Sequence, residues 1–272
     1  MNRINETFAR LQREGRKALI TFITAGDPSL DQTPALVTAM AANGADIIEL
    51  GVPFSDPLAD GPTIQAASMR SIHLGTTLRD IIAMVGEIRS RCPVPLVLMS
   101  YYNPILVYGI DNFVADAVVA GVNGVIIPDL PPEEGEHLRR EAEARELALI
   151  QLVSPTSTPE RMAKLCRLST GFVYYVMVTG ITGARRELPP AVAESLQQLK
   201  SLTDTPIAAG FGISTPAQAA EVGQYADGVI VGSALVKIVA EHGGELDLPE
   251  RLGAFVHELR LGLDGGVRVG GD

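Results

Sequence analysis

Two acidic residues stand out because of their surroundings in the sequence. Glu49 lies within the apolar run of residues 47–50, and Asp60 lies in the proline-rich segment that follows it. A carboxylate inside an apolar strand is either paired or kept for chemistry, because desolvation raises its pKa. Two carboxylates that face one pocket suit acid–base catalysis. The plainer alternatives are a solvent-facing strand end for Glu49 and, for Asp60, a cap for the helix expected near Pro62.

Glycine-rich turns form a second group of candidate site residues. They occupy residues 179–183, 210–214 and 232–234, and each follows an apolar run. Glycine lets backbone N–H groups approach an anion closely, and a helix that starts nearby adds partial positive charge. One such turn would be weak evidence, because glycine is common in any tight turn. Three of them together indicate a phosphate site.

Residues that other catalytic mechanisms need do not stand at suitable positions. A Schiff-base aldolase needs a lysine at a strand end, and a metal-dependent enzyme needs clustered histidines and carboxylates. The lysines and histidines all fall in predicted helices or outer loops: Lys17, Lys164, Lys200, Lys237, His73, His137, His242 and His257. Cys92 and Cys166 lack the spacing of a metal or redox pair. The sequence therefore predicts a site without a metal and without a covalent amine.

Apolar runs alternate with helical segments along the chain. Strands are expected at residues 18–23, 46–50, 96–100, 124–127, 148–152, 172–176, 206–209 and 228–231. Helices are expected at residues 5–13, 33–43, 78–90, 110–120, 133–145, 159–168, 190–202, 216–222 and 249–261. Alternation of this kind means parallel strands, and eight such units in about 250 residues fit a closed barrel. The prediction is an α/β fold, a (β/α)8 TIM barrel with an extra N-terminal helix.

No linker or break in composition divides the chain, so residues 1–272 are expected to form one domain, with residues 265–272 as a disordered tail. The main alternative is an open doubly wound sheet, but no G-x-G-x-x-G follows the first strand. In (β/α)8 barrels the reacting groups lie at the C-terminal ends of the strands, and phosphate sites use the loops after strands seven and eight. This rule places Glu49, Asp60 and the last two glycine turns at one end of the barrel.

The charge of the chain restricts its partners. Its formal net charge is −10 and its pI is about 4.9. An acidic chain repels nucleic-acid phosphates and anionic lipids. No apolar stretch approaches the length of a membrane span, and the first residues do not resemble a signal peptide. We therefore expect a cytoplasmic protein that binds neither nucleic acid nor membranes.

Residues 49–62 resemble the signature of a known family, the alpha chains of tryptophan synthase. Their sequence is ELGVPFSDPLADGP. The resemblance covers nearly the whole chain and includes residues 22–28, 102–104, 128–131, 174–176, 179–183, 210–214 and 231–234. It implies a lyase of L-tryptophan biosynthesis. The implied reaction is the retro-aldol cleavage of indole-3-glycerol phosphate to indole and D-glyceraldehyde 3-phosphate.

The resemblance also implies roles for the two carboxylates. Glu49 matches the family's acid–base group, which protonates carbon 3 of the indole ring and helps to remove the side-chain hydroxyl proton. Asp60 matches the group that accepts a hydrogen bond from the indole N–H. An anion there stabilises the positive charge that develops in the transition state. Tyr175 matches a pocket residue that supports the carboxylates.

Further matches concern substrate binding. The backbone donors to the phosphate are expected at Gly183, Gly212, Gly232 and Ser233. The wall of the indole pocket is expected at Phe22, Ile64, Tyr101 and Phe211. The segment through Arg185 matches a mobile lid, which excludes water when it closes. Thr182 would then form a hydrogen bond toward Asp60.

The resemblance further implies a partner, the beta chain of tryptophan synthase, in an alpha2beta2 tetramer. Pyridoxal phosphate would belong to that beta chain, and no cofactor is expected on this chain. The loop around Asp56 and residues 128–132 match the family's interface with the beta chain. A proline-stiffened loop with exposed apolar residues suits docking, although it also suits a plain rigid loop.

Two hypotheses from other classes compete with the lyase. A sugar-phosphate isomerase or epimerase on the same scaffold would explain the glycine turns equally well, but it predicts a metal or a histidine at a strand end. A regulatory subunit that binds phosphate esters without chemistry would explain the phosphate site, but it gives no reason for the carboxylate pair. Turnover of a ribulose phosphate would favour the isomerase, and binding without cleavage would favour the regulatory subunit.

Overall fold

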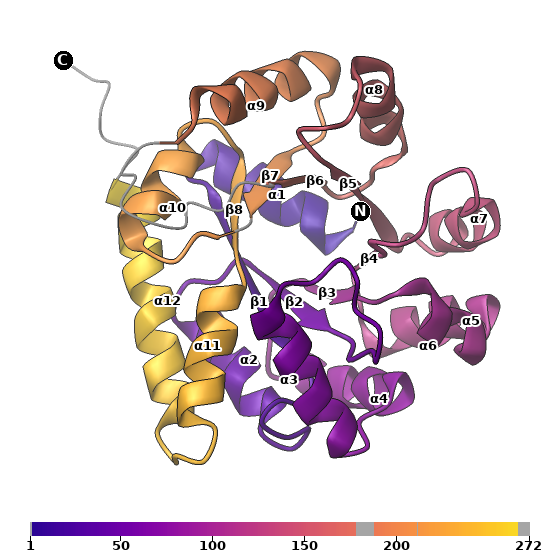
Figure 1. Ribbon diagram of the computed structural model, residues 1–272, viewed down its shortest axis with the longest axis vertical. Helices are drawn as coiled ribbons and strands as arrows, with labels where there is room; N and C mark the ends of the chain where they lie inside the picture. Colours follow the sequence, from indigo (N-terminus) through magenta and orange to yellow (C-terminus); the bar gives the residue numbers. More distant parts are fainter. Residues whose placement is uncertain (1, 178–187, 211, 266–272) are drawn as a thin grey trace.

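The structure is a computed structural model that describes residues 2–177, 188–210 and 212–265. Its strands are β1 (Ala18–Thr24), β2 (Ile47–Gly51), β3 (Leu96–Met99), β4 (Gly124–Ile126), β5 (Ala148–Val153), β6 (Val173–Val176), β7 (Ile207–Gly210) and β8 (Gly228–Val231). All neighbouring pairs are parallel, and β8 pairs with β1, so the sheet closes into a barrel (Figure 1). The predicted (β/α)8 barrel is confirmed, and an open sheet is excluded.

Helices cover the outside of this barrel and one of its ends (Figure 1). They are α1 (Arg3–Arg13), α2 (Thr33–Ala42), α3 (Pro62–His73), α4 (Leu78–Arg89), α5 (Tyr102–Tyr108), α6 (Ile110–Ala120), α7 (Glu136–Ala144), α8 (Pro159–Leu168), α9 (Pro190–Leu202), α10 (Pro216–Gly223), α11 (Ser233–His242) and α12 (Leu248–Gly265). The sequence patterns predict each of them except α5 and α11. Helix α5 is short and contains a proline, and α11 follows β8 after a single residue, which hides its start.

Most strand residues are buried because the helices cover the outside of the barrel and side chains fill its inside. Alternate side chains of β1 show this division. Leu19 and Ile23 belong to the large apolar core between the strands and the helices. Ala18 and Ile20 belong to a second cluster inside the barrel, which also contains Ile47 of β2. Because both faces of the strands are buried, each strand appears in the sequence as a continuous apolar run rather than as an alternation of apolar and polar residues.

Helix α1 closes the N-terminal end of the barrel. Its apolar residues Ile4, Phe8 and Leu11 recur at helical spacing and pack with the side chains inside the barrel. Asn2 fixes the start of this helix by accepting a hydrogen bond from the N–H of Ile4. The side-chain amide of Asn2 also donates to the carbonyl of Asn123, at 2.7 Å. Because these side chains fill the N-terminal end of the barrel, an opening into its interior is expected at the C-terminal ends of the strands.

The C-terminal region differs from the expected tail at its first residue. Gly265 is the last residue of α12, and residues 266–272 lie outside the described residues. Within the described part of the chain, no helix combines the length and the apolarity that crossing a membrane requires.

Candidate active site

A cavity of about 240 Å³ opens among the C-terminal ends of the strands. Its lining residues are Phe22, Ala59, Asp60, Ile64, Met99, Pro128, Leu152, Val153, Ser154, Tyr174, Val176, Gly212, Ile230, Gly232 and Ser233. A larger cavity, of about 570 Å³, lies beside α1 at the opposite end. We assign the active site to the smaller one, because reacting groups in (β/α)8 barrels lie at the C-terminal ends of the strands.

Glu49 lies inside the barrel just beneath this cavity. In the parallel register it pairs with Phe22 of β1, which lines the cavity, and with Val97 of β3, which belongs to the inner cluster. Its side chain has no solvent exposure, and within the described residues neither carboxylate oxygen has a hydrogen-bond partner. Burial raises the pKa of Glu49 to about 8. The carboxyl group therefore holds its proton at neutral pH, which suits a general acid.

Asp60 reaches the same cavity from the loop after β2. Burial raises the pKa of its carboxyl group, while a hydrogen bond from Tyr101 lowers it. The charges of Glu49 and Asp60, after burial itself, raise the pKa of Tyr174, so both carboxylates act on one tyrosine ring. Helix α3 takes Gly61 as its N-cap, without a side-chain cap. The alternative that Asp60 caps this helix is therefore wrong.

Tyr101 forms a hydrogen bond with Asp60 but is not among the residues that line the cavity. Its hydroxyl group donates to Oδ2 of Asp60 at 3.1 Å and accepts from the N–H of Ala59 at 2.8 Å. Its ring stacks on Phe54, with 5.1 Å between the ring centroids. The expected place of Tyr101 in the indole pocket wall is therefore corrected to a position that fixes the loop and its carboxylate.

The tyrosine of β6 that faces the cavity is Tyr174. Successive side chains of a strand point to opposite faces. Tyr174 lines the cavity, whereas the ring of Tyr175 is fully buried in the core between the strands and the helices. The prediction that Tyr175 lies in the pocket is wrong by one position. Nothing in the sequence distinguishes the two, because both faces of this strand are buried.

The expected phosphate end consists of backbone groups at the turns after β7 and β8. Gly212 lines the cavity with a φ of 81°, in the left-handed region that favours glycine. Gly232 and Ser233 line it where α11 begins. The first N–H groups of a helix have no partner within the helix, and they carry partial positive charge. This end of the cavity is therefore suited to an anion.

The remaining predicted residues divide between the cavity and segments outside the structure. Phe22 and Ile64 line the cavity. Thr182, Gly183, Arg185 and Phe211 lie outside the described residues. Sequence reasoning missed several apolar lining residues, namely Met99, Pro128, Leu152, Val153, Val176 and Ile230, as well as the polar Ser154. Position at the end of a predicted strand, or in the turn after it, is the signal that could have identified most of them.

Comparison with known proteins identifies the family. Residues 8–259 match the family model described as tryptophan synthase alpha chain. A tryptophan synthase alpha chain of Geotalea uraniireducens is 51% identical over 263 residues, which cover 97% of this chain and 98% of that protein. One of Pelobacter propionicus is 52% identical over 267 residues, covering 98% of this chain and 100% of that protein.

Solved structures give the same result. The tryptophan synthase subunit alpha of Legionella pneumophila superposes with a TM-score of 0.90 at 38% identity, covering 97% of this chain and 99% of that one. A chain of Mycobacterium tuberculosis tryptophan synthase, in its aminoacrylate-bound form, superposes with a TM-score of 0.87 at 39% identity, covering 97% and 100%. The chain therefore belongs to the tryptophan synthase alpha chain family, the enzyme subunits that cleave indole-3-glycerol phosphate into indole and glyceraldehyde 3-phosphate.

Proposed function

We propose that Glu49 supplies both proton transfers of this cleavage. Its protonated carboxyl group donates to carbon 3 of the indole ring, which leaves a positive charge on the ring nitrogen and a carboxylate on Glu49. That carboxylate then removes the proton of the side-chain hydroxyl group, the bond between the ring and the side chain breaks, and its electron pair restores the aromatic ring. The observation that carries this proposal is a buried Glu49 with a pKa of about 8, directly beneath the cavity.

We propose that Asp60 stabilises the positive charge of the ring. Its ionised carboxylate would accept a hydrogen bond from the indole N–H, and this bond strengthens as the charge develops. Asp60 lines the cavity, and its loop is fixed by the hydroxyl group of Tyr101. The ring of Phe22 and the aliphatic side chain of Ile64 would pack against the flat indole ring in this cavity.

We propose that the phosphate of the substrate binds at the start of α11, to N–H groups of Gly232 and Ser233, with Gly212 beside them. Gly183, Phe211 and Thr182, which the family resemblance adds to the site, stay predictions. Because Asp60 and the glycine turns after β7 and β8 line one cavity, with Glu49 beneath it, a substrate with an indole ring at one end and a phosphate at the other would span it.

Removal of the phosphate from the substrate tests the proposed anion site. With indole-3-glycerol in place of indole-3-glycerol phosphate, we expect kcat/KM to fall by about 100-fold or more, because remote binding energy positions the reacting carbon. The measurement is indole release under steady-state conditions. A decrease smaller than tenfold would contradict the proposed phosphate site and would leave the roles of Glu49 and Asp60 untouched.

Replacement of Tyr101 by phenylalanine tests the support of Asp60. Loss of a hydrogen bond to a charged group costs about 1.5–3 kcal/mol, so kcat/KM is expected to fall by about 10- to 100-fold. Since the hydroxyl group lowers the pKa of Asp60, the acidic limb of the pH profile should move to higher pH. Tyr108→Phe is the matched control, because it removes a similar bond of 2.6 Å to Asp116 outside the cavity. Equal profiles for wild type and Tyr101→Phe would refute this role.

We propose that the chain works with a tryptophan synthase beta chain as an alpha2beta2 tetramer in the cytoplasm, with pyridoxal phosphate bound by the beta chain. The loop after β2 supports a docking role, because Leu58 is 93% exposed at its tip while Phe54 stacks on Tyr101 and stiffens it. Docking at this loop would act on the backbone next to Asp60. Residues 128–132 complete the proposed interface, and Pro128 itself lines the cavity.

A further inference from the structure

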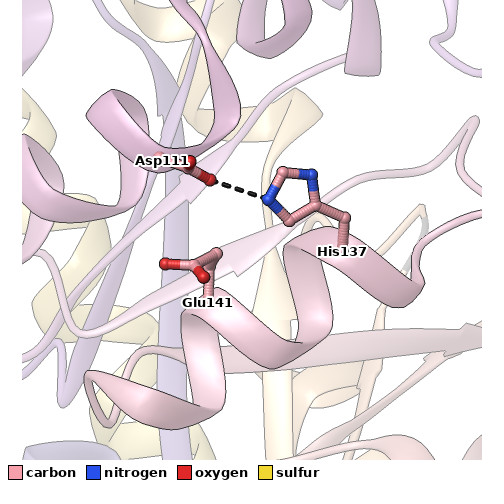
Figure 2. A group of neighbouring side chains, drawn as sticks. All are labelled: Asp111, His137 and Glu141. Atoms are coloured by element: carbon pink, nitrogen blue, oxygen red, sulfur yellow. Dashed lines mark ion pairs between the residues drawn. The ribbon is translucent and has the colours of Figure 1, made fainter.

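Three side chains from two neighbouring helices converge on the outer surface, away from the active site. Asp111 lies in the first turn of α6, and His137 and Glu141 lie on α7 (Figure 2). Nε2 of His137 lies 2.8 Å from Oδ1 of Asp111. One potential ligand atom from each residue lies within 4.8 Å of the other two. This is the kind of side-chain set that binds a metal ion.

The sequence and the packing of the helices explain the convergence. His137 and Glu141 are four residues apart on α7, so their side chains point to the same face of the helix. Helix α6 packs against α7, and its first turn presents Asp111 to that face. The side chains of His137 and Asp111 are 53% and 64% exposed, so an ion from solvent can reach them.

We propose that Asp111, His137 and Glu141 bind one divalent transition-metal ion, with Zn²⁺ as the best match. An imidazole with two carboxylates is a ligand set that zinc and cobalt accept. Two ligand atoms about 2.1 Å from a tetrahedral ion lie about 3.4 Å apart, so small side-chain rotations would close the set. Water would complete the coordination. The net charge of −10 favours the approach of a cation.

Arg145 would compete with such an ion for the carboxylate of Glu141. Arg145 is the C-cap residue of α7, and its guanidinium group donates to Oε2 of Glu141, four residues earlier, at 2.5 Å. A carboxylate has two oxygens, so Oε1 is available to a metal while Arg145 keeps the other. The neighbouring positive charge nevertheless weakens the attraction of Glu141 for a cation. Removal of Arg145 should therefore strengthen metal binding, an effect that a nonspecific surface histidine would not show.

Bound metal would join α6 to α7 by a link that the folded state has and the unfolded chain lacks. Binding to the folded state alone raises the midpoint of thermal unfolding. At a free Zn²⁺ concentration a hundredfold above the dissociation constant, we expect an increase of roughly 5 °C for a chain of this size. The site lies apart from the proposed catalytic groups, so the shift does not depend on turnover.

Titration calorimetry with ZnCl₂ on the untagged full chain tests the proposal. We expect one strong site per chain, weakened about tenfold or more in His137→Ala, Asp111→Asn and Glu141→Gln, and strengthened in Arg145→Ala. His242→Ala is the matched control. His242 also pairs with a carboxylate, Glu245 at 2.9 Å, but no third ligand group joins them within the described residues. Co²⁺ should give visible absorption bands that His137→Ala removes.

Three outcomes would overturn the proposal. Either wild-type chain binds no Zn²⁺ more tightly than His137→Ala does, or His242→Ala weakens binding as much as His137→Ala. Circular dichroism of each variant shows whether it is folded, and the exposure of these side chains makes unfolding unexpected. If Asp111→Asn or Glu141→Gln leaves the affinity unchanged while His137→Ala removes it, the site is a single surface imidazole, and the three-residue assignment is wrong.

Discussion

Indole release from indole-3-glycerol phosphate is expected to fall by at least about 1,000-fold when Glu49 is replaced by glutamine. Glutamine keeps the shape of the side chain but can neither donate an acidic proton nor take one up. Because both proton transfers use the same group, kcat should fall while KM changes little. The measurement is steady-state indole formation with a beta chain present. Activity within tenfold of wild type would remove Glu49 from the mechanism.

The pH dependence of wild-type activity should report the same carboxyl group. The protonated form of Glu49 starts the reaction, and burial raises its pKa to about 8. We therefore expect kcat/KM to decline as the pH rises through about 8. Asp60 must be ionised, so activity should also decline at acidic pH. Because burial raises the pKa of Asp60, this decline should begin at a higher pH than for an ordinary aspartate. A profile that stays level from pH 7 to 9.5 would disagree with this assignment.

Folding stability offers a check on Glu49 that does not depend on turnover. The pKa is about 8 in the folded chain against an ordinary value of 4.5. Between these values the unfolded chain has released this proton and the folded chain has kept it, so rising pH favours unfolding. Glu49→Gln has no such proton. The melting temperature of Glu49→Gln minus that of wild type should therefore increase as the pH rises from about 4.5 to 8. A difference that stays constant over this range would contradict the raised pKa.

Replacement of Asp60 by asparagine is expected to lower kcat by about 100- to 1,000-fold, the range found when one preorganised transition-state contact is lost. An amide oxygen can still accept the indole N–H, but it lacks the charge that opposes the developing positive charge of the ring. The ground-state ring is neutral, so KM should change much less than kcat. Steady-state indole formation by the variant separates the two parameters.

The control for this substitution is Asp116→Asn. Asp116 accepts a tyrosine hydroxyl group on the helical surface, as Asp60 does beside the cavity. Loss of a carboxylate there should leave kcat and KM unchanged. If Asp60→Asn raised KM and left kcat intact, Asp60 would contribute ground-state binding only, and the proposed stabilisation of ring charge would be wrong.

The strands were predictable from sequence to within one residue at each end. Parallel strands that are buried on both faces produce continuous apolar runs bounded by turn residues, and this signal is local. The helix starts were less clear. The predicted helix at residues 133–145 spans Glu136–Ala144, because residues 132–134 form a turn before it. Helix α11 was not predicted, because strand, turn and helix follow one another within a few residues.

The sequence by itself determined the barrel and the position of Glu49 within a buried strand, because both depend on local pattern and chain order. Only the tertiary structure decided that Tyr174 rather than Tyr175 faces the cavity, since a strand buried on both faces shows no alternation from which the inner face could be read. It also decided that Tyr101 contacts Asp60 across 41 residues of sequence, and that His137 meets Asp111. Such contacts depend on how separate elements pack, which no single segment encodes.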